Sequence, residues 1–134
     1  MNFPSMSPGF VAASAGYDVW LGNTRGNTYS PSHTHLDPEK DAKKFYDYDW
    51  TDLVKDDKAV ISYILAHTQQ EKVAYVGHSM GTTQMFTGLS QDEAWFKDKL
   101  SIFVALGPVT KITNTTVTVL QIMDHFYREV YDAD

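Results

Sequence analysis

The residues best suited to chemistry in this chain form a Gly-x-Ser-x-Gly pattern, Gly77-His78-Ser79-Met80-Gly81. In such a pattern the serine lies on a sharp strand-to-helix turn that lifts its hydroxyl clear of the backbone. A serine presented in this way can attack an ester carbonyl, provided that a histidine takes its proton and a carboxylate orients that histidine. The backbone N–H of Met80 would stabilise the oxyanion that forms. The pattern therefore predicts a nucleophile elbow with Ser79 as the nucleophile, and an ordinary Gly/Ser turn is the alternative.

The other three residues of the pattern have different expected roles. Neighbouring chain passes close to the serine in a turn of this kind, so a Cβ at Gly77 or Gly81 is expected to clash. His78 is predicted to be structural and to point into the turn, because adjacent residues rarely have the geometry for proton transfer to one another. These residues shape the turn and leave the base to be supplied from elsewhere.

One histidine follows Ser79 in the sequence, His125. The acidic residues between the two are Asp92, Glu93, Asp98 and Asp124. The order serine, acid, histidine is the one that this kind of elbow uses. His125 is thus a candidate base, but it falls in a sequence that resembles a helix face, and a surface histidine is the preferred interpretation.

The elements that must position Ser79 are an apolar strand before it and a helix after it. Residues Lys72 to Val76 have the composition of a buried strand, and Met80 to about Ser90 can form a short helix. An acidic and aromatic connection, Gln91 to Lys99, then leads to a second strand from Ile102 to Leu106, which ends at Gly107-Pro108. The turn is thus expected at the carboxyl end of a strand.

Further elements are predicted upstream. Apolar residues at three- and four-residue spacings predict a helix from Trp50 to His67, capped by Asp49 or Thr51. The remaining expectations are a short helix over Ser7–Gly16, a strand over Tyr17–Leu21, a surface loop over Tyr29–Tyr48 and an amphipathic helix from about Val117 to Tyr131. Three strands separated by helices indicate an α/β fold, with a parallel sheet covered by helices on both faces.

Three other features of the sequence have possible functional roles. His33 and His35 could share a face of an extended chain and bind a metal, but no third ligand is specified, so two solvated histidines are preferred. Arg25 is expected to bind loop carbonyls or carboxylates in a structural role. Asn114-Thr115-Thr116 is a glycosylation sequon, which has meaning only in a secreted protein.

The bulk composition narrows the class of protein. The 134 residues suit one modest domain, and the net charge of −6 disfavours nucleic acid as a partner. The sequence has no cysteine and no apolar run of membrane-spanning length. Because the first residues lack a basic segment and an apolar core, no signal peptide is predicted, and either the protein is cytosolic or its true start is missing.

Three stretches together resemble the acid lipase family, the gastric and lysosomal triacylglycerol and cholesteryl ester lipases. They are Ala15-Gly16-Tyr17-Asp18-Val19-Trp20-Leu21-Gly22-Asn23-Thr24-Arg25-Gly26-Asn27-Thr28, Tyr75-Val76-Gly77-His78-Ser79-Met80-Gly81-Thr82-Thr83, and Ala105-Leu106-Gly107-Pro108-Val109. The resemblance implies a partial α/β-hydrolase core over residues 1–115, and residues 116–134 would be the start of a lid or cap region or a divergent tail. It also implies hydrolysis of neutral lipid esters (triacylglycerol or steryl ester) at a lipid–water interface, no metal and no organic cofactor, and a secreted or lysosomal location for the full-length family.

The chain differs from this family at one residue of the Gly-x-Ser-x-Gly pattern and lacks several of the family's features. Met80 stands where members usually carry glutamine, which leaves the backbone donor in place. No His-Gly loop for the second oxyanion donor is found before Ser7, and the family's acid and base follow later strands than this sequence contains. The middle strand between Tyr17–Leu21 and Lys72–Val76 is also absent. Either those two strands pair directly, or the chain is an incomplete piece of a longer protein, which is the favoured interpretation.

The sequence therefore predicts a lipid ester hydrolase that uses Ser79 and is incomplete in this chain. The alternative is a catalytically inactive, truncated α/β-hydrolase domain that serves as a lipid-binding or interaction module. A hydrolase of other small esters or thioesters is a third possibility, which differs in substrate alone.

Overall fold

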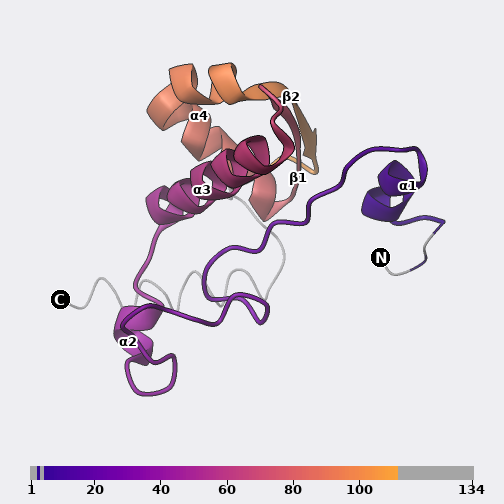
Figure 1. The fold of residues 1–134 in the computed structure, drawn as a ribbon. Coiled ribbons are helices and arrows are strands. Elements are labelled where there is room, and N and C mark those ends of the chain that lie inside the picture. The colour runs from indigo at the N-terminus through magenta and orange to yellow at the C-terminus, as the bar shows by residue number, and fades with distance from the viewer. Residues whose placement is uncertain (1–2, 4, 112–134) are drawn as a thin grey trace.

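The computed structural model describes residue 3 and residues 5–111 of the chain (Figure 1). Within them lie the elements α1 (Pro8–Ser14), α2 (Ala42–Phe45), α3 (Trp50–Thr68), β1 (Val73–His78), α4 (Met80–Lys99) and β2 (Leu100–Leu106). The predictions for residues 116–134, for His125 and for Asn114 fall outside the described residues. The elements that matter for Ser79 are the last four, which lie together in Figure 1, whereas α1 lies apart from them.

Helix α3 begins where its sequence provides a cap. The Asp49 side chain accepts hydrogen bonds from the N–H groups of Thr51 (2.7 Å) and Asp52 (3.3 Å), and the Asp52 carboxylate accepts one from the Asp49 N–H (3.3 Å). This reciprocal arrangement satisfies donors that the first helical turn leaves free. The predicted helix from Trp50 to His67 and its cap at Asp49 are therefore confirmed, with Thr68 added at the end.

Strands β1 and β2 form a parallel pair, as predicted, and their carboxyl ends lie side by side. Tyr75 is paired with Phe103 and His78 with Leu106. Parallel pairing requires a crossover, which α4 provides. The turn after β1 and the turn after β2 are consequently neighbours in space.

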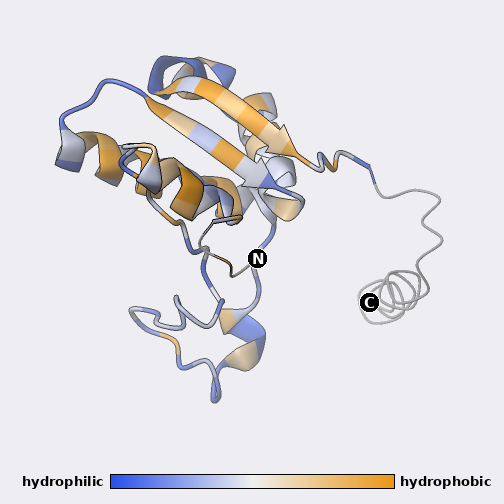
Figure 2. Cartoon of the chain, turned by 90° about the vertical axis from the view of Figure 1, so that its right-hand side faces the viewer, coloured by the Kyte–Doolittle hydropathy of each residue, from blue (hydrophilic) through white to orange (hydrophobic). Residues whose placement is uncertain are grey.

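The core lies between one face of this sheet and the two long helices. Val54 and Ile61 of α3 form a buried cluster with Met85 and Phe96 of α4. Hydrophobic residues of the strands and helices pack against it: Leu65, Val73, Tyr75, Leu89, Trp95, Leu100 and Phe103. Figure 2 shows the hydrophobic strands lying against these helices.

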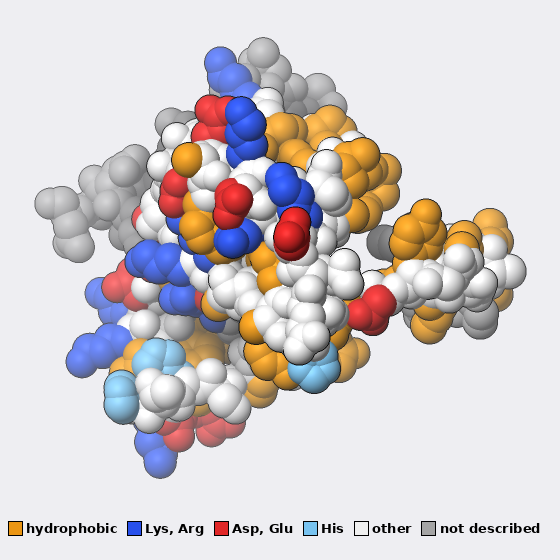
Figure 3. All heavy atoms as spheres, turned by 45° about the horizontal axis from the view of Figure 1, so that its top comes forward, with side chains coloured by type: hydrophobic (Ala, Val, Ile, Leu, Met, Phe, Trp, Pro, Cys, Tyr) orange, Lys and Arg blue, Asp and Glu red, His pale blue; other side chains and the backbone are white. Residues whose placement is uncertain are grey.

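Within the described residues, the helices cover this one face of the sheet. The sequence predicted helices on both faces. Side chains alternate across a strand, and those on the opposite face stay open to solvent. Val76 is 59% exposed and Ile102 is 55% exposed. Figure 3 shows hydrophobic side chains gathered at the surface at upper right, and again on the separate lobe that holds α1. No helix in the described part of the chain is long and apolar enough to cross a membrane.

Helix α4 is longer than predicted because it continues through a kink. The connection expected over Gln91–Lys99 is wrong: those residues are helical apart from Asp92, whose φ of −151° and ψ of 66° break the helix. The Asp92 carboxylate accepts hydrogen bonds from the Trp95 N–H at 3.2 Å and from Lys58 Nζ of α3 at 2.6 Å. The aspartate thus begins a new helical segment and ties it to the neighbouring helix.

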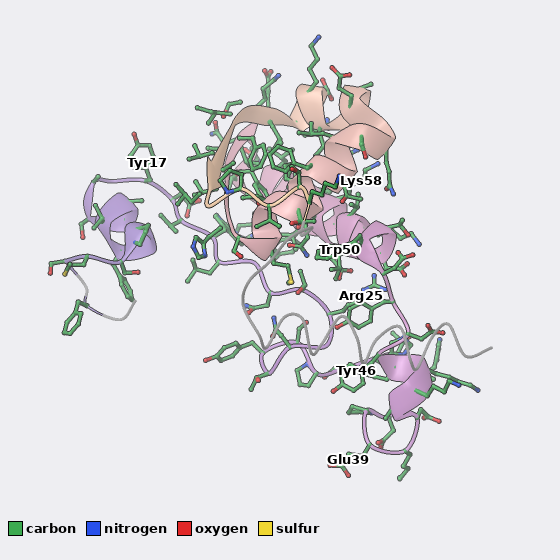
Figure 4. All side chains as sticks on the ribbon, turned by 180° about the vertical axis from the view of Figure 1, so that it is seen from behind. Tyr17, Arg25, Glu39, Tyr46, Trp50 and Lys58 are labelled. Atoms are coloured by element: carbon green, nitrogen blue, oxygen red, sulfur yellow. The ribbon has the colours of Figure 1, made fainter. Side chains whose placement is uncertain are left out.

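The predicted strand Tyr17–Leu21 is also wrong, because the segment has no strand beside it among the described residues. Figure 4 shows Tyr17 next to α1, away from the sheet, and its side chain is 72% exposed. Trp20 instead packs edge-on against Tyr63 and His67 of α3, with ring centroids 6.0 and 5.5 Å away. A strand exists only where a neighbour satisfies its backbone groups.

The expected loop over Tyr29–Tyr48 contains the short helix α2. Its Phe45 is buried and contacts the rings of His33 and Tyr46. This contact holds the otherwise irregular segment together.

Candidate active site at the turn between β1 and α4

Ser79 forms the bend that joins β1 to α4. Its backbone has φ 51° and ψ −112°. Among the described non-glycine residues, only Ser79 and Gln69 have a positive φ. Such a conformation costs of order 1–3 kcal/mol and is kept where the surroundings enforce it. The serine is exposed and lies before the first residue of the helix. The predicted bend at the end of a strand is therefore present, with the hydroxyl at the surface.

The two glycines of the turn differ, which corrects the sequence-based prediction. A Cβ on Gly77 would lie 2.8 Å from both the carbonyl carbon and oxygen of Gly81, which leaves no room for a side chain. A Cβ on Gly81 would meet nothing closer than the Tyr75 hydroxyl at 3.9 Å, an ordinary contact. The expected clash is confirmed at Gly77 and is wrong at Gly81, where the described residues leave room for a Cβ.

Helix α4 directs its N-terminal end at the space beside Ser79. The N–H groups of a first helical turn have no partner within the helix, and they lie at the positive end of the helix dipole. Met80 is the first helical residue and is 50% exposed. Its N–H is thus one of these first-turn donors, and its service as an oxyanion donor stays a prediction.

Tyr75 of β1 stabilises the same turn through a hydrogen bond. Its hydroxyl donates to the Gly81 carbonyl at 3.2 Å. Burial, with a contribution from Asp57, raises the pKa of Tyr75 above its usual value. The tyrosine consequently keeps its proton and remains a donor to the elbow at all ordinary pH values.

A set of hydrogen bonds, which sequence analysis missed, ties Ser79 to the loop after β2. The Ser79 N–H donates to the Leu106 carbonyl at 2.9 Å, and the Thr82 hydroxyl donates to the Ser79 carbonyl at 2.6 Å. The Val109 N–H donates to Thr82 Oγ1 at 3.0 Å, and the Thr83 hydroxyl donates to the Val109 carbonyl at 2.8 Å. The available signal was the pair of threonines one turn after the serine, at the sheet edge where both strands end.

No histidine of the described residues is hydrogen-bonded to Ser79. The His78 residue is exposed, and a Cβ on Gly107 would lie 4.0 Å from its Nε2, so the imidazole lies beside the first residue after β2. Its direction into the turn stays a prediction. Within residue 3 and residues 5–111, the Ser79 hydroxyl has no hydrogen-bond partner. His125, the other candidate base, falls outside the described residues.

Arg25 contacts a carboxylate, as predicted. Its guanidinium binds Asp56 of α3 through Nη2 at 2.6 Å and Nε at 2.9 Å, and Figure 4 shows Arg25 beside that helix. Arg25 and Asp56 also form part of the wall of a pocket of about 350 Å³. The pocket is lined by Arg25, Gly26, Ser32, His33, Thr34, Lys44, Phe45, Asp47, Tyr48 and Asp56. Arg25 thus holds its loop to α3, and the pocket does not include Ser79.

The metal-binding alternative for His33 and His35 finds no support in the described residues. His33 Nδ1 accepts the N–H groups of His35 and Leu36, both at 3.0 Å, so its lone pair is already used. The described part of the chain contains no group of three metal-ligating side chains.

Comparison with known proteins gives a consistent result. The family model described as alpha/beta hydrolase fold matches residues 2–134. The chain is 45% identical over 113 residues to lipase lipl-5 of Caenorhabditis elegans, which covers 84% of this chain and 28% of that protein. It is 38% identical over 136 residues to the gastric triacylglycerol lipase of Bos taurus, covering 99% of this chain and 34% of that protein. It is 39% identical over 134 residues to the lysosomal acid lipase/cholesteryl ester hydrolase of Homo sapiens, covering 97% of this chain and 33% of that protein. The chain therefore spans about a third of the length of these relatives.

Proposed function

Because the chain belongs to the alpha/beta hydrolase fold family and is similar in sequence to gastric and lysosomal lipases, we propose that it contributes the nucleophile of a lipid ester hydrolase. Ser79 is the acyl-accepting residue in this proposal. The observation that carries it is the backbone of Ser79, which is held at φ 51° between β1 and α4 with its side chain exposed. A strained, exposed serine at a strand-to-helix turn is the geometry of the nucleophile elbow in this fold.

The reaction would proceed in two steps. The Ser79 hydroxyl oxygen forms a bond to the ester carbonyl carbon while its proton passes to a histidine base, and the Met80 N–H stabilises the oxyanion. The alcohol leaves with that proton, and water then hydrolyses the acyl-enzyme. His125 is the histidine that follows Ser79 in this chain, and it remains a candidate base.

The substrate class follows from the relatives. Two of those compared above are named as triacylglycerol lipase and cholesteryl ester hydrolase, so neutral lipid esters at a lipid–water interface are the proposed substrates. Their names also indicate gastric and lysosomal settings, and we extend a secreted or lysosomal location to the complete enzyme.

A fluorophosphonate probe tests the nucleophile. An activated Ser79 gives its hydroxyl proton to the base and forms an Oγ–P bond as the P–F bond breaks and fluoride leaves. We therefore expect stoichiometric labelling that is abolished in Ser79→Ala. Ser90→Ala is the matched control, since Ser90 is an exposed serine of α4, the helix that follows Ser79, and labelling should persist in it. Absence of labelling in the unmodified chain would sink the proposal and favour an inactive lipid-binding or interaction module.

A further inference from the structure

Thr82 occupies an unusual position behind the nucleophile. It is fully buried, and its hydroxyl makes two hydrogen bonds in opposite directions. It donates to the Ser79 carbonyl at 2.6 Å and accepts from the Val109 N–H at 3.0 Å. The hydroxyl therefore joins the nucleophile's own backbone to the loop after β2.

The Ser79 carbonyl is significant because of the peptide to which it belongs. A peptide unit is planar, so the C=O of Ser79 and the N–H of Met80 point in opposite directions within one rigid plane. The carbonyl accepts the Thr82 N–H at 2.9 Å as well as the Thr82 hydroxyl. Holding that oxygen therefore fixes the direction in which the Met80 N–H points.

The loop after β2, Gly107–Val109, is held by Thr82 and by its neighbour Thr83. Gly107 has a φ of 57°, and Pro108 has no N–H with which to bond. Val109 is fastened through both of its backbone polar groups, to Thr82 Oγ1 and to the Thr83 hydroxyl (2.8 Å). Gly107 and Pro108 are exposed, so this short loop stands beside the turn and is held mainly from Val109.

We propose that Thr82 is a positioning residue, which aims the Met80 N–H at the developing oxyanion and fixes the Gly107–Val109 loop beside Ser79. The inference rests on the proposed role of Ser79 as nucleophile. Thr82 does not touch the substrate; it acts through the Ser79–Met80 peptide and through Val109. A small error in the direction of an oxyanion donor is costly, since loss of one such donor lowers the rate by about 10²–10³.

The test compares Thr82→Val with Thr82→Ser in the full chain. Valine keeps the shape but has no hydroxyl, so the fluorophosphonate labelling of Ser79 should slow by about tenfold in its maximal rate, with an unchanged half-saturating probe concentration. Serine restores the hydroxyl and should label within about twofold of the unmodified chain. Amide hydrogen exchange at Val109 should be faster in Thr82→Val and normal in Thr82→Ser.

Thr87→Val is the matched control for helix stability. Thr87 lies on the same helix and donates its hydroxyl to the Thr83 carbonyl at 2.8 Å, so its replacement removes a comparable bond one turn further from Ser79. Its labelling rate should equal that of the unmodified chain. Labelling of Thr82→Val at the rate of Thr87→Val, with Val109 exchange unchanged, would overturn the positioning role while Ser79 stayed the nucleophile. An unmodified chain that takes no label would overturn the nucleophile, and the positioning role with it.

Discussion

Gly77 and Gly81 are equally far from Ser79 in sequence, yet their surroundings demand different things of them. Alanine at 77 would place its Cβ 2.8 Å from the Gly81 backbone, so we expect a loss of about 1–3 kcal/mol of stability and of fluorophosphonate labelling. Alanine at 81 meets no close atom, and in a helix it should be neutral or stabilising by about 0.5–1 kcal/mol. Thermal unfolding and labelling of both variants measure this, and equal damage at the two positions would contradict it.

Asp57 is the residue that should make stability depend on pH. Burial, with repulsion from Asp56, raises its pKa from 3.8 to about 7, and its Oδ2 has no partner among the described residues. The folded chain holds this proton up to about pH 7, whereas the unfolded chain releases it near pH 4. The stability from the neutral form is thus present below about pH 4 and is lost as the pH rises to about 7, by at most about 4 kcal/mol. Denaturant unfolding against pH should show this slope, and Asp57→Asn should flatten it; a slope that survives in the variant would refute the assignment.

Other carboxylates act in the opposite direction. Hydrogen bonds and cations lower the pKa of Asp37, Asp49, Asp52, Asp92 and Asp98. Stability from these groups is present above the unfolded pKa of about 4 and is lost as the pH falls through their folded values. The pH dependence of stability from these groups therefore has the opposite sign to that from Asp57.

At the scale of elements, the kink in α4 brings two of its own residues together. A Cβ on Gly88 would lie 2.6 Å from the Phe96 ring, and Phe96 is fully buried. We expect Gly88→Ala to cost about 1–3 kcal/mol, because the ring cannot move without disturbing the core. Gly9→Ala in α1 is the control, since its Cβ would lie 3.5 Å from Leu21 and should be tolerated. Chemical denaturation of the two variants measures the difference, and a Gly88→Ala chain as stable as the control would argue against this packing.

The same kink shows where sequence patterns stop being informative. Helix α3 and both strands were predictable because each has a clear apolar period and a cap or turn at its ends. The helical segment after Asp92 was not, because its acidic composition resembles a connection and its stability comes from burying Phe96 and from the bond to Lys58. Tertiary contacts of that kind leave no local pattern.

The candidate site was predictable to a similar extent. Ser79, its bend and the close contact at Gly77 follow from five residues of sequence. The hydrogen bond between Val109 and Thr82 joins residues 27 positions apart and depends on the pairing of β1 with β2, whose register the sequence alone does not give. Tyr17–Leu21 was misassigned because strand propensity does not reveal whether a neighbouring strand exists.

At the scale of the whole molecule, α1 is nearly independent of the rest. Within the described residues its contacts are with the segment that follows it, through the Tyr17 N–H bonded to Ala12 and through Gly9 near Leu21, and Figure 1 shows it set apart. Removal of residues 1–16 should therefore shift the unfolding temperature by less than about 2 °C and leave the labelling of Ser79 unchanged. Val54→Ala, which empties a core position, is the contrasting variant and should cost about 1–3 kcal/mol. A truncated chain that unfolds as readily as the core variant would show that α1 packs more tightly than its contacts indicate.

The left-handed backbone at position 79 also bears on whether the domain is a working or a degenerate one. Glycine would adopt φ 51° with far less strain, so glycine at this position would give a more stable fold than serine does. A side chain at this position therefore lowers the stability of the fold, and other interactions must offset that cost. Such a penalty makes sense where the oxygen atom itself is needed.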